Sequence, residues 1–283
     1  PCCRHPHSLR LRASPISGRY FDGTIMSEHL GRHWLLLRGL SRESAHWGDF
    51  PSLLRMRLPH AEIATLDLPG TGAHYRELSP STLTDITDSL RVQAAGDGLL
   101  KQPLTLLGLS LGGMVAWDWA SRYPHDVCGV VLINSSFANL SPFYRRLRWQ
   151  SYANVFNVLG QRDVCQRERA ILQWVINRRD LDEAVAQAWA QIQSRHPVSM
   201  RTTVNQLVAA ARYIADQKPS SPVLLLNSAG DRLVDPACSQ AISEHWQLPL
   251  MTHPWSGHDL PLDDGNWVAE RLLSWVKLEC GAI

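Results

Sequence analysis

Short apolar runs alternate with segments of helical periodicity along most of the chain. The runs have the length of buried strands, and they lie at residues 34–37, 63–67, 103–108, 127–133, 223–226 and 248–252. Between most of them, apolar residues recur every three or four positions, which is the spacing of an amphipathic helix. Strands that alternate with helices are typical of β-α-β units, so the pattern predicts an α/β fold with a doubly wound, mostly parallel sheet.

The alternation stops between residues 137 and 219. This segment has no strand-like run, but apolar residues follow helical spacing within 172–176, 185–192 and 204–211. We therefore predict a helical lid over 137–219, inserted into an α/β core that consists of 26–136 and 220–283.

The first 25 residues differ from both of these parts. They are rich in Arg, Pro, Ser and His and show no periodic apolar pattern. We expect residues 1–25 to be a disordered extension that lies outside the fold. An organellar transit peptide is the alternative, because the segment has several arginines and Asp22 as its single acidic residue.

Composition narrows the class of protein. Hydrophobic residues make up 45% of the 283 residues and charged residues 19%, so the chain is able to bury a sizeable core. The net charge of +2 gives no indication of a nucleic-acid or membrane-surface partner. The 6 cysteines have neither the density of a disulfide scaffold nor the spacing of a metal site. No apolar run reaches the roughly 20 residues that span a bilayer, and we expect a cytoplasmic protein.

A candidate nucleophile lies where the third predicted strand meets a predicted helix. Ser110 has Gly108 and Gly112 two residues to either side. In a sharp strand-to-helix turn of this kind, the serine hydroxyl is exposed above the sheet and the glycines allow strand and helix to approach closely. The N-terminus of the helix also offers unpaired N–H groups to a developing oxyanion. The motif therefore predicts acyl-transfer chemistry at Ser110.

A serine nucleophile needs a base and a group that orients the base. Asp231 and His258 follow the last two predicted strands, in the order acid and then histidine. Each has a rival: Asp235 precedes Pro236 and is suited to cap a helix there, and His253 comes directly off the last strand. We predict a catalytic triad of Ser110, Asp231 and His258.

Several motifs in this order resemble the α/β-hydrolase family, in its branch of lidded serine esterases. The resemblance covers about residues 33–279, and it is carried by the segments 34–39, 67–72, 108–112, 230–234 and 257–262. It implies an open sheet with a helical lid inserted after the strand that ends near Asn134. It also implies that the backbone N–H groups of Leu40 and Leu111 form the oxyanion hole.

The chain departs from the family at Arg38, where members commonly have histidine before the glycine. Arg38 could face the cleft and bind a substrate carboxylate, or its stem could pack while its guanidinium bonds nearby carbonyls. Family members also usually begin with an antiparallel hairpin, and this chain shows no convincing one. Phe143 and Trp149 are further candidates for substrate binding, although they could instead hold the lid together.

The predicted lid is basic. Residues 137–219 contain 12 Lys and Arg residues against 6 Asp and Glu residues. A solvated helical surface would explain this charge, and so would a docking surface for an acidic acyl-carrier partner or an anionic acyl substrate.

The residues favour a serine hydrolase that cleaves a carboxylic ester or thioester through an acyl-enzyme on Ser110. Two alternatives remain at this point: a carbon–carbon bond hydrolase with the same triad, and a non-catalytic ligand-sensing protein with this fold. We expect no metal or organic cofactor, and neither a nucleic-acid nor a membrane partner.

Overall fold

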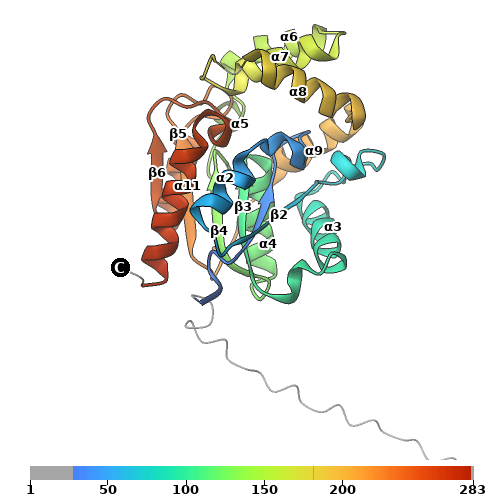
Figure 1. Ribbon diagram of the computed structural model, residues 1–283. Coiled ribbons are helices and arrows are strands. Elements are labelled where there is room, and N and C mark those ends of the chain that lie inside the picture. The colour runs from blue at the N-terminus through green and yellow to red at the C-terminus, as the bar shows by residue number, and fades with distance from the viewer. Residues whose placement is uncertain (1–27, 181, 282–283) are drawn as a thin grey trace, which may run out of the picture.

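The computed structural model of the chain describes residues 28–180 and 182–281, so the extension expected over 1–25 lies outside the described residues (Figure 1). The strands are β1 (His33–Leu37), β2 (Glu62–Leu66), β3 (Leu104–Leu109), β4 (Val127–Ile133), β5 (Val223–Ser228) and β6 (Leu250–His253). The α-helices are α2 (Phe50–Arg57), α3 (Leu83–Gly96), α4 (Leu111–Arg122), α5 (Phe143–Arg146), α6 (Tyr152–Gly160), α7 (Val164–Val175), α8 (Asp182–Arg195), α9 (Met200–Arg212), α10 (Ala237–Trp246) and α11 (Leu260–Glu279). Short 3-10 helices lie at η1 (Ser44–Trp47), η2 (Gly72–His74), η3 (Leu99–Lys101) and η4 (Trp149–Ser151).

All six strands form one sheet in the order β2-β1-β3-β4-β5-β6. Every pairing among the described residues is parallel. The predicted α/β fold with a doubly wound sheet is therefore confirmed. The carboxyl ends of the strands meet at one edge of the sheet, so the loops that follow β1, β3, β5 and β6 lie close together there.

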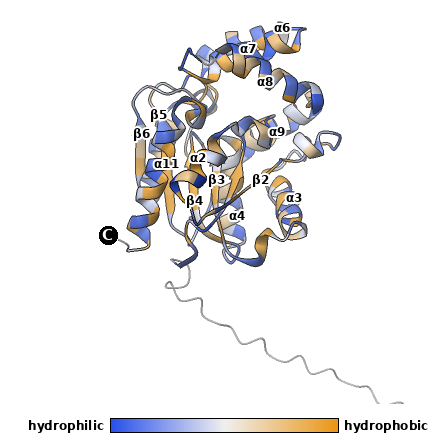
Figure 2. Ribbon diagram, viewed as in Figure 1, coloured by the Kyte–Doolittle hydropathy of each residue, from blue (hydrophilic) through white to orange (hydrophobic). Residues whose placement is uncertain are grey.

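Side chains alternate between the two faces of the sheet along each strand, and helices pack against both faces. In β1, Leu35 and Leu37 pack in one apolar cluster with helices α3 and α4. Trp34 and Leu36 pack in a second cluster with α2 and α11. All seven residues of β4 are buried, which agrees with its uncharged sequence. Figure 2 shows the strands mostly in the hydrophobic colour and the helices with one hydrophobic and one hydrophilic side.

The segment between β4 and β5 is helical, with α5 to α9 and η4. Helices α7 and α8 have a small apolar cluster of their own, which includes Leu172, Ile176 and Trp189. Figure 1 shows α6, α7 and α8 on one side of the sheet, separate from the helices that flank its faces. Within the described ranges, no helix is both long and apolar enough to cross a bilayer.

Gly48, with a φ of 54°, separates η1 from α2. Helix α11 is kinked at Asp264, whose φ and ψ are −150° and 74°.

Candidate active site

Ser110 lies in a sharp turn between β3 and α4. Its φ and ψ are 57° and −116°, a conformation that a residue with a side chain rarely adopts. A Cβ on Gly108 would lie 2.2 Å from the carbonyl oxygen of Gly112, and one on Gly112 would lie 2.3 Å from that of Leu37. Both glycines are therefore required by close backbone approach. The Ser110 N–H donates to the carbonyl of Ile133 at 2.8 Å, which fixes the turn to β4.

Ser110 borders a small pocket of about 110 Å³. The other residues that line it are mostly apolar: Leu40, Leu111, Met114, Ser136, Phe143, Arg146, Leu147, Leu207, Ala210, Ala211, Leu233 and Val234. The two predicted oxyanion donors, Leu40 and Leu111, thus border the same pocket as Ser110. Leu111 is the first residue of α4, where backbone N–H groups have no acceptor within the helix. The positive end of the helix dipole points into the same region.

Asp231 and His258 are in direct contact and both are buried, with 1% and 5% of their surface exposed. The His258 Nδ1 lies 2.7 Å from Asp231 Oδ2. The other carboxylate oxygen of Asp231 accepts the N–H groups of Leu233 at 2.7 Å and Val234 at 2.9 Å. Because an ionised carboxylate only accepts hydrogen bonds, Nδ1 carries the proton and Nε2 of the neutral ring is free to act as a base.

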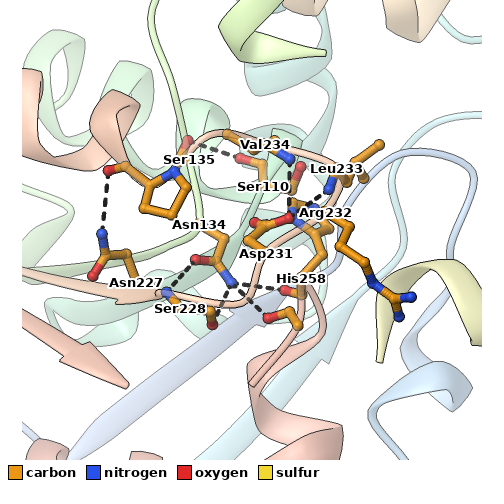
Figure 3. A network of polar contacts seen from close by, with 12 residues as sticks. Ser110, Asn134, Ser135, Asn227, Ser228, Asp231, Arg232, Leu233, Val234 and His258 are labelled. Atoms are coloured by element: carbon orange, nitrogen blue, oxygen red, sulfur yellow. Dashed lines mark hydrogen bonds and ion pairs between the residues drawn. The ribbon is translucent and has the colours of Figure 1, made fainter. Parts of the chain in front are cut away.

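Figure 3 draws Ser110 together with this pair, and Asn134 and Ser135, which are neighbours in the chain, connect them: Asn134 bonds to the His258 carbonyl and Ser135 to that of Ser110. Ser135 Oγ donates to the Ser110 carbonyl at 2.9 Å. Among the hydrogen bonds of the described residues there is none between the Ser110 hydroxyl and the His258 ring. Hydrogen bonds of this kind are often long in a free enzyme and shorten when substrate is bound.

Asn134 organises the loops around the site and was not predicted from the sequence. Its Nδ2 donates to the carbonyl of His258 at 2.8 Å and to Ser228 Oγ at 3.0 Å. Its Oδ1 accepts the N–H of Ser228 at 2.9 Å. The signal that could have indicated Asn134 is its place directly after a fully apolar strand, since such a position lies at the carboxyl edge of the sheet.

Asp263 is a second residue that sequence reasoning missed. One carboxylate oxygen accepts the N–H of Gly257 at 2.6 Å, and both accept the N–H of Asn177 at 3.0 Å. The segment between β4 and β5 is thereby fixed to the loop that carries His258. Burial raises the pKa of the Asp263 carboxyl, although its backbone N–H donors act to lower the pKa.

The two rivals for the triad have other partners. His253 is buried, its Nδ1 accepts the N–H of Ser256 at 3.1 Å, and its Nε2 lies 3.3 Å from Asp264 Oδ2. Asp235 accepts the N–H of Ala237 at 3.0 Å, at the start of α10. Both residues therefore have structural partners, and neither is bonded to the pair formed by Asp231 and His258.

Arg38 is held inside the protein. Its guanidinium donates to both carboxylate oxygens of Asp259 at 2.6 and 3.2 Å, and each side chain is only 3% exposed. The same group lies 4.8 Å from the centre of the Trp47 ring. Asp259 thus supplies a carboxylate for Arg38 inside the protein, and binding of a substrate carboxylate by Arg38 stays a prediction. The pair joins the loop after β1 to the loop that carries His258.

Of the other two residues predicted to bind substrate, Phe143 and Trp149, only the first lies at the pocket. Phe143 borders the pocket of Ser110, whereas Trp149 is 64% exposed and does not line that pocket.

Arg145, Arg146 and Arg148 form a cluster of arginines at the start of the helical segment, and two of them bond to backbone carbonyls. Arg146 Nη1 donates to the carbonyl of Ala211 at 3.0 Å, and Arg148 Nη1 donates to that of Asp231 at 2.6 Å. These two cations are thus used to fix the segment near the site, and Arg145 of this cluster is exposed.

Of the apolar residues of α9, Leu207, Ala210 and Ala211 line the pocket. Val204 and Leu207 are 47% and 43% exposed, while the buried residues of this helix are Thr202, Gln206 and Ala209. The pattern predicted the helix correctly but not the direction of its apolar face.

No group of three or more His, Cys, Asp or Glu side chains within 28–180 and 182–281 is arranged to hold a metal ion.

A sequence model of the alpha/beta hydrolase family matches residues 34–271. The chain belongs to this family. A pimeloyl-(acyl-carrier protein) methyl ester esterase of Xylella fastidiosa (strain M12) is 26% identical over 247 residues, which is 82% of this chain and 91% of that protein. Monoacylglycerol lipase ABHD6 of Mus musculus is 29% identical over 122 residues. That match covers 40% of this chain and only 34% of the lipase.

Solved α/β hydrolases have the same architecture. The enol-lactonase from Burkholderia xenovorans LB400 matches with a TM-score of 0.68 and 15% identity, over 87% of this chain and 92% of that protein. This structural likeness shows the fold alone. The relatives that are named esterases support an ester-cleaving hydrolase, without indicating its substrate or mechanism.

Proposed function

We propose that the protein is a serine hydrolase that cleaves a carboxylic ester or thioester through an acyl-enzyme on Ser110. The contact between His258 and Asp231, at the edge of the sheet where the Ser110 turn lies, is the observation that carries the proposal. In an α/β hydrolase this edge is where loops from several strands meet, so three distant segments supply one site.

In the first half of the reaction, Ser110 Oγ attacks the carbonyl carbon of the substrate while His258 Nε2 takes its proton. The tetrahedral oxyanion is stabilised by the N–H groups of Leu40 and Leu111. The bond to the leaving group then breaks, and His258 returns the proton to the departing alcohol or thiol.

In the second half, His258 removes a proton from water, and the resulting hydroxide attacks the ester carbonyl on Ser110. The oxyanion forms in the same place, the bond to Ser110 Oγ breaks, and the serine recovers its proton from His258. The products are a carboxylic acid and the free enzyme. Asp231 stabilises the imidazolium that forms in both halves, since its carboxylate is fixed by two backbone N–H groups.

We propose an acyl group on an acidic carrier as one substrate class. The positive charge of residues 137–219 supports this, as does the name of the Xylella fastidiosa relative, which acts on an acyl-carrier protein ester. Cleavage of a carrier-linked ester should then weaken with rising salt much more than cleavage of a short neutral ester. An equal salt response would remove the carrier from the proposal.

The function is tested with a fluorophosphonate probe and a panel of esters, thioesters and vinylogous diketones. Wild-type protein should be labelled on Ser110 and should cleave esters or thioesters, while a folded Ser110→Ala variant should do neither. Labelling with turnover of the diketones alone would favour a carbon–carbon bond hydrolase. A folded wild-type protein without label or turnover would favour a non-catalytic binding role.

A further inference from the structure

The loop after β1, residues 38–42, carries the proposed oxyanion donor Leu40, and this inference rests on the function proposed above. The next residue, Ser41, has a φ of 54° although it is not glycine. A backbone conformation of this kind costs on the order of 1–3 kcal/mol and persists only where surrounding contacts impose it. The contacts of Ser41 therefore determine the shape of the loop at the oxyanion hole.

Those contacts come from α9, in the segment between β4 and β5. Gln206 Oε1 accepts the backbone N–H of Ser41 at 2.8 Å. The Ser41 hydroxyl lies 2.8 Å from Thr203 Oγ1. Thr203 precedes Gln206 by about one turn of α9. Two hydrogen bonds thus join the residue after Leu40 to one side of α9.

Gln206 is itself well fixed. Its side chain is fully buried, at 0% exposed, and Nε2 donates to the carbonyl of Pro69 at 3.3 Å. Since both ends of the amide are bonded, the side chain is able to impose a direction on the Ser41 N–H. A glutamine at an exposed face of a helix would have no such effect.

Leu40 consequently lies between two anchors. On one side Arg38 is paired with Asp259, and on the other Ser41 is bonded to Gln206. The same side of α9, one turn or less further along, contributes Leu207, Ala210 and Ala211 to the pocket of Ser110. One helix therefore contacts both the substrate pocket and the loop of the oxyanion donor.

We propose that Gln206 is a positioning residue for catalysis, which sets the direction of the Leu40 N–H in the oxyanion hole by holding the backbone of Ser41. It does not touch the reacting atoms. Its effect is on the transition state, because the oxyanion forms only there.

The first variant is Gln206→Met, which keeps the volume and removes the acceptor. We expect kcat to fall about 10- to 100-fold with KM changed by less than about threefold, as for other small misplacements near a reacting centre. The factor should be the same for esters of short and long acyl chains, because every ester passes through the same oxyanion. An increase in KM, or a fall in kcat that grows with the length of the acyl chain, would indicate a role in substrate binding and overturn the proposal.

Gln206→Glu supplies a rescue test. When protonated, the carboxyl accepts from Ser41 and donates to Pro69 as the amide does. Relative to wild type at each pH, this variant should retain the most kcat at the acidic end, and more than Gln206→Met there. Equal kcat of the two variants at every pH would contradict the assigned geometry.

Asn205→Leu is the matched control, since Asn205 is on the same helix and donates to the carbonyl of Ser79 at 2.7 Å, away from the oxyanion loop. It should keep kcat within about threefold. Amide hydrogen exchange gives a readout that needs no activity: the Ser41 amide should exchange at least about tenfold faster in Gln206→Met and not in Asn205→Leu. Unchanged exchange in Gln206→Met overturns the inference, whereas an inactive wild type overturns only the proposed function.

Discussion

The sheet and the helical segment between β4 and β5 are held by different kinds of contact. The sheet is covered on both faces by apolar side chains from α2, α3, α4 and α11. The segment meets the loops of the sheet largely through buried polar contacts. Arg42 donates to Glu168 at 2.6 Å, and Glu168 is 1% exposed. Gln206 and Asn177 bond to Ser41 and Asp263 in the same region.

The difference matters because apolar contacts have little directional preference, whereas hydrogen bonds fix orientation. Apolar packing gives the sheet its stability, and polar contacts place the loops that carry the reactive groups. The helical segment is therefore more than a cover over the pocket. Its hydrogen bonds reach Ser41 next to Leu40, the carbonyl of Asp231, and Asp263, which bonds to the His258 loop.

The largest effect should come from the acid of the triad. Asp231→Asn is expected to lower kcat about 10⁴-fold with little loss of stability, because the amide no longer holds the correct tautomer of His258. Ester hydrolysis under saturating substrate measures this. Asp235→Asn is the control, since Asp235 bonds to the start of α10. Equal losses in both variants would contradict the assignment of the acid.

The next prediction concerns the buried ion pair of Arg38 and Asp259, which is one of the polar contacts between loops. Arg38→Met leaves the Asp259 carboxylate buried without its cation, and it should reduce the free energy of unfolding by about 3–5 kcal/mol. The double variant Arg38→Met with Asp259→Leu removes both charges and should recover most of that loss. Urea unfolding measures both. A double variant less stable than the single one would contradict this account.

The smallest effect concerns His46, whose ring packs against that of Trp189 where the two regions meet. Burial, followed by the nearby Arg42 and Arg38 cations, lowers the pKa of His46 well below its ordinary value. In the unfolded chain that pKa is about 6.5. Below about pH 6.5 the unfolded chain thus binds a proton that the folded chain does not, and stability is lost as pH falls.

The slope from this group should reach about 1.4 kcal/mol per pH unit. Urea unfolding between about pH 7.5 and about pH 5 should show a steeper loss in wild type than in His46→Gln. Identical slopes in the two proteins would show that His46 is not the group responsible.

Much of the sheet and part of the site were predictable from the sequence. Strands such as β4 have apolar residues at every position because both faces are buried, and their runs are easy to recognise. Ser110 was predicted from the glycines on either side of it at a strand-to-helix junction. Asp231 and His258 were predicted from their order after the last two strands, since loops after parallel strands converge at one edge.

The contacts that place these residues were not predictable. Arg38 and Asp259 are 221 residues apart in the chain, and no local pattern indicates that they meet. In α9 the apolar Leu207 lines the pocket and Val204 is exposed, whereas the polar Gln206 is buried. Periodicity identifies a helix but does not show whether its apolar face meets a core or a ligand.

The most direct test is to trap the acyl-enzyme. Wild-type protein mixed with a slowly hydrolysed p-nitrophenyl ester and quenched in acid should gain the mass of one acyl group, located by peptide mapping on Ser110. Ester hydrolysis with no adduct, or with an adduct on another residue, would contradict catalysis by Ser110.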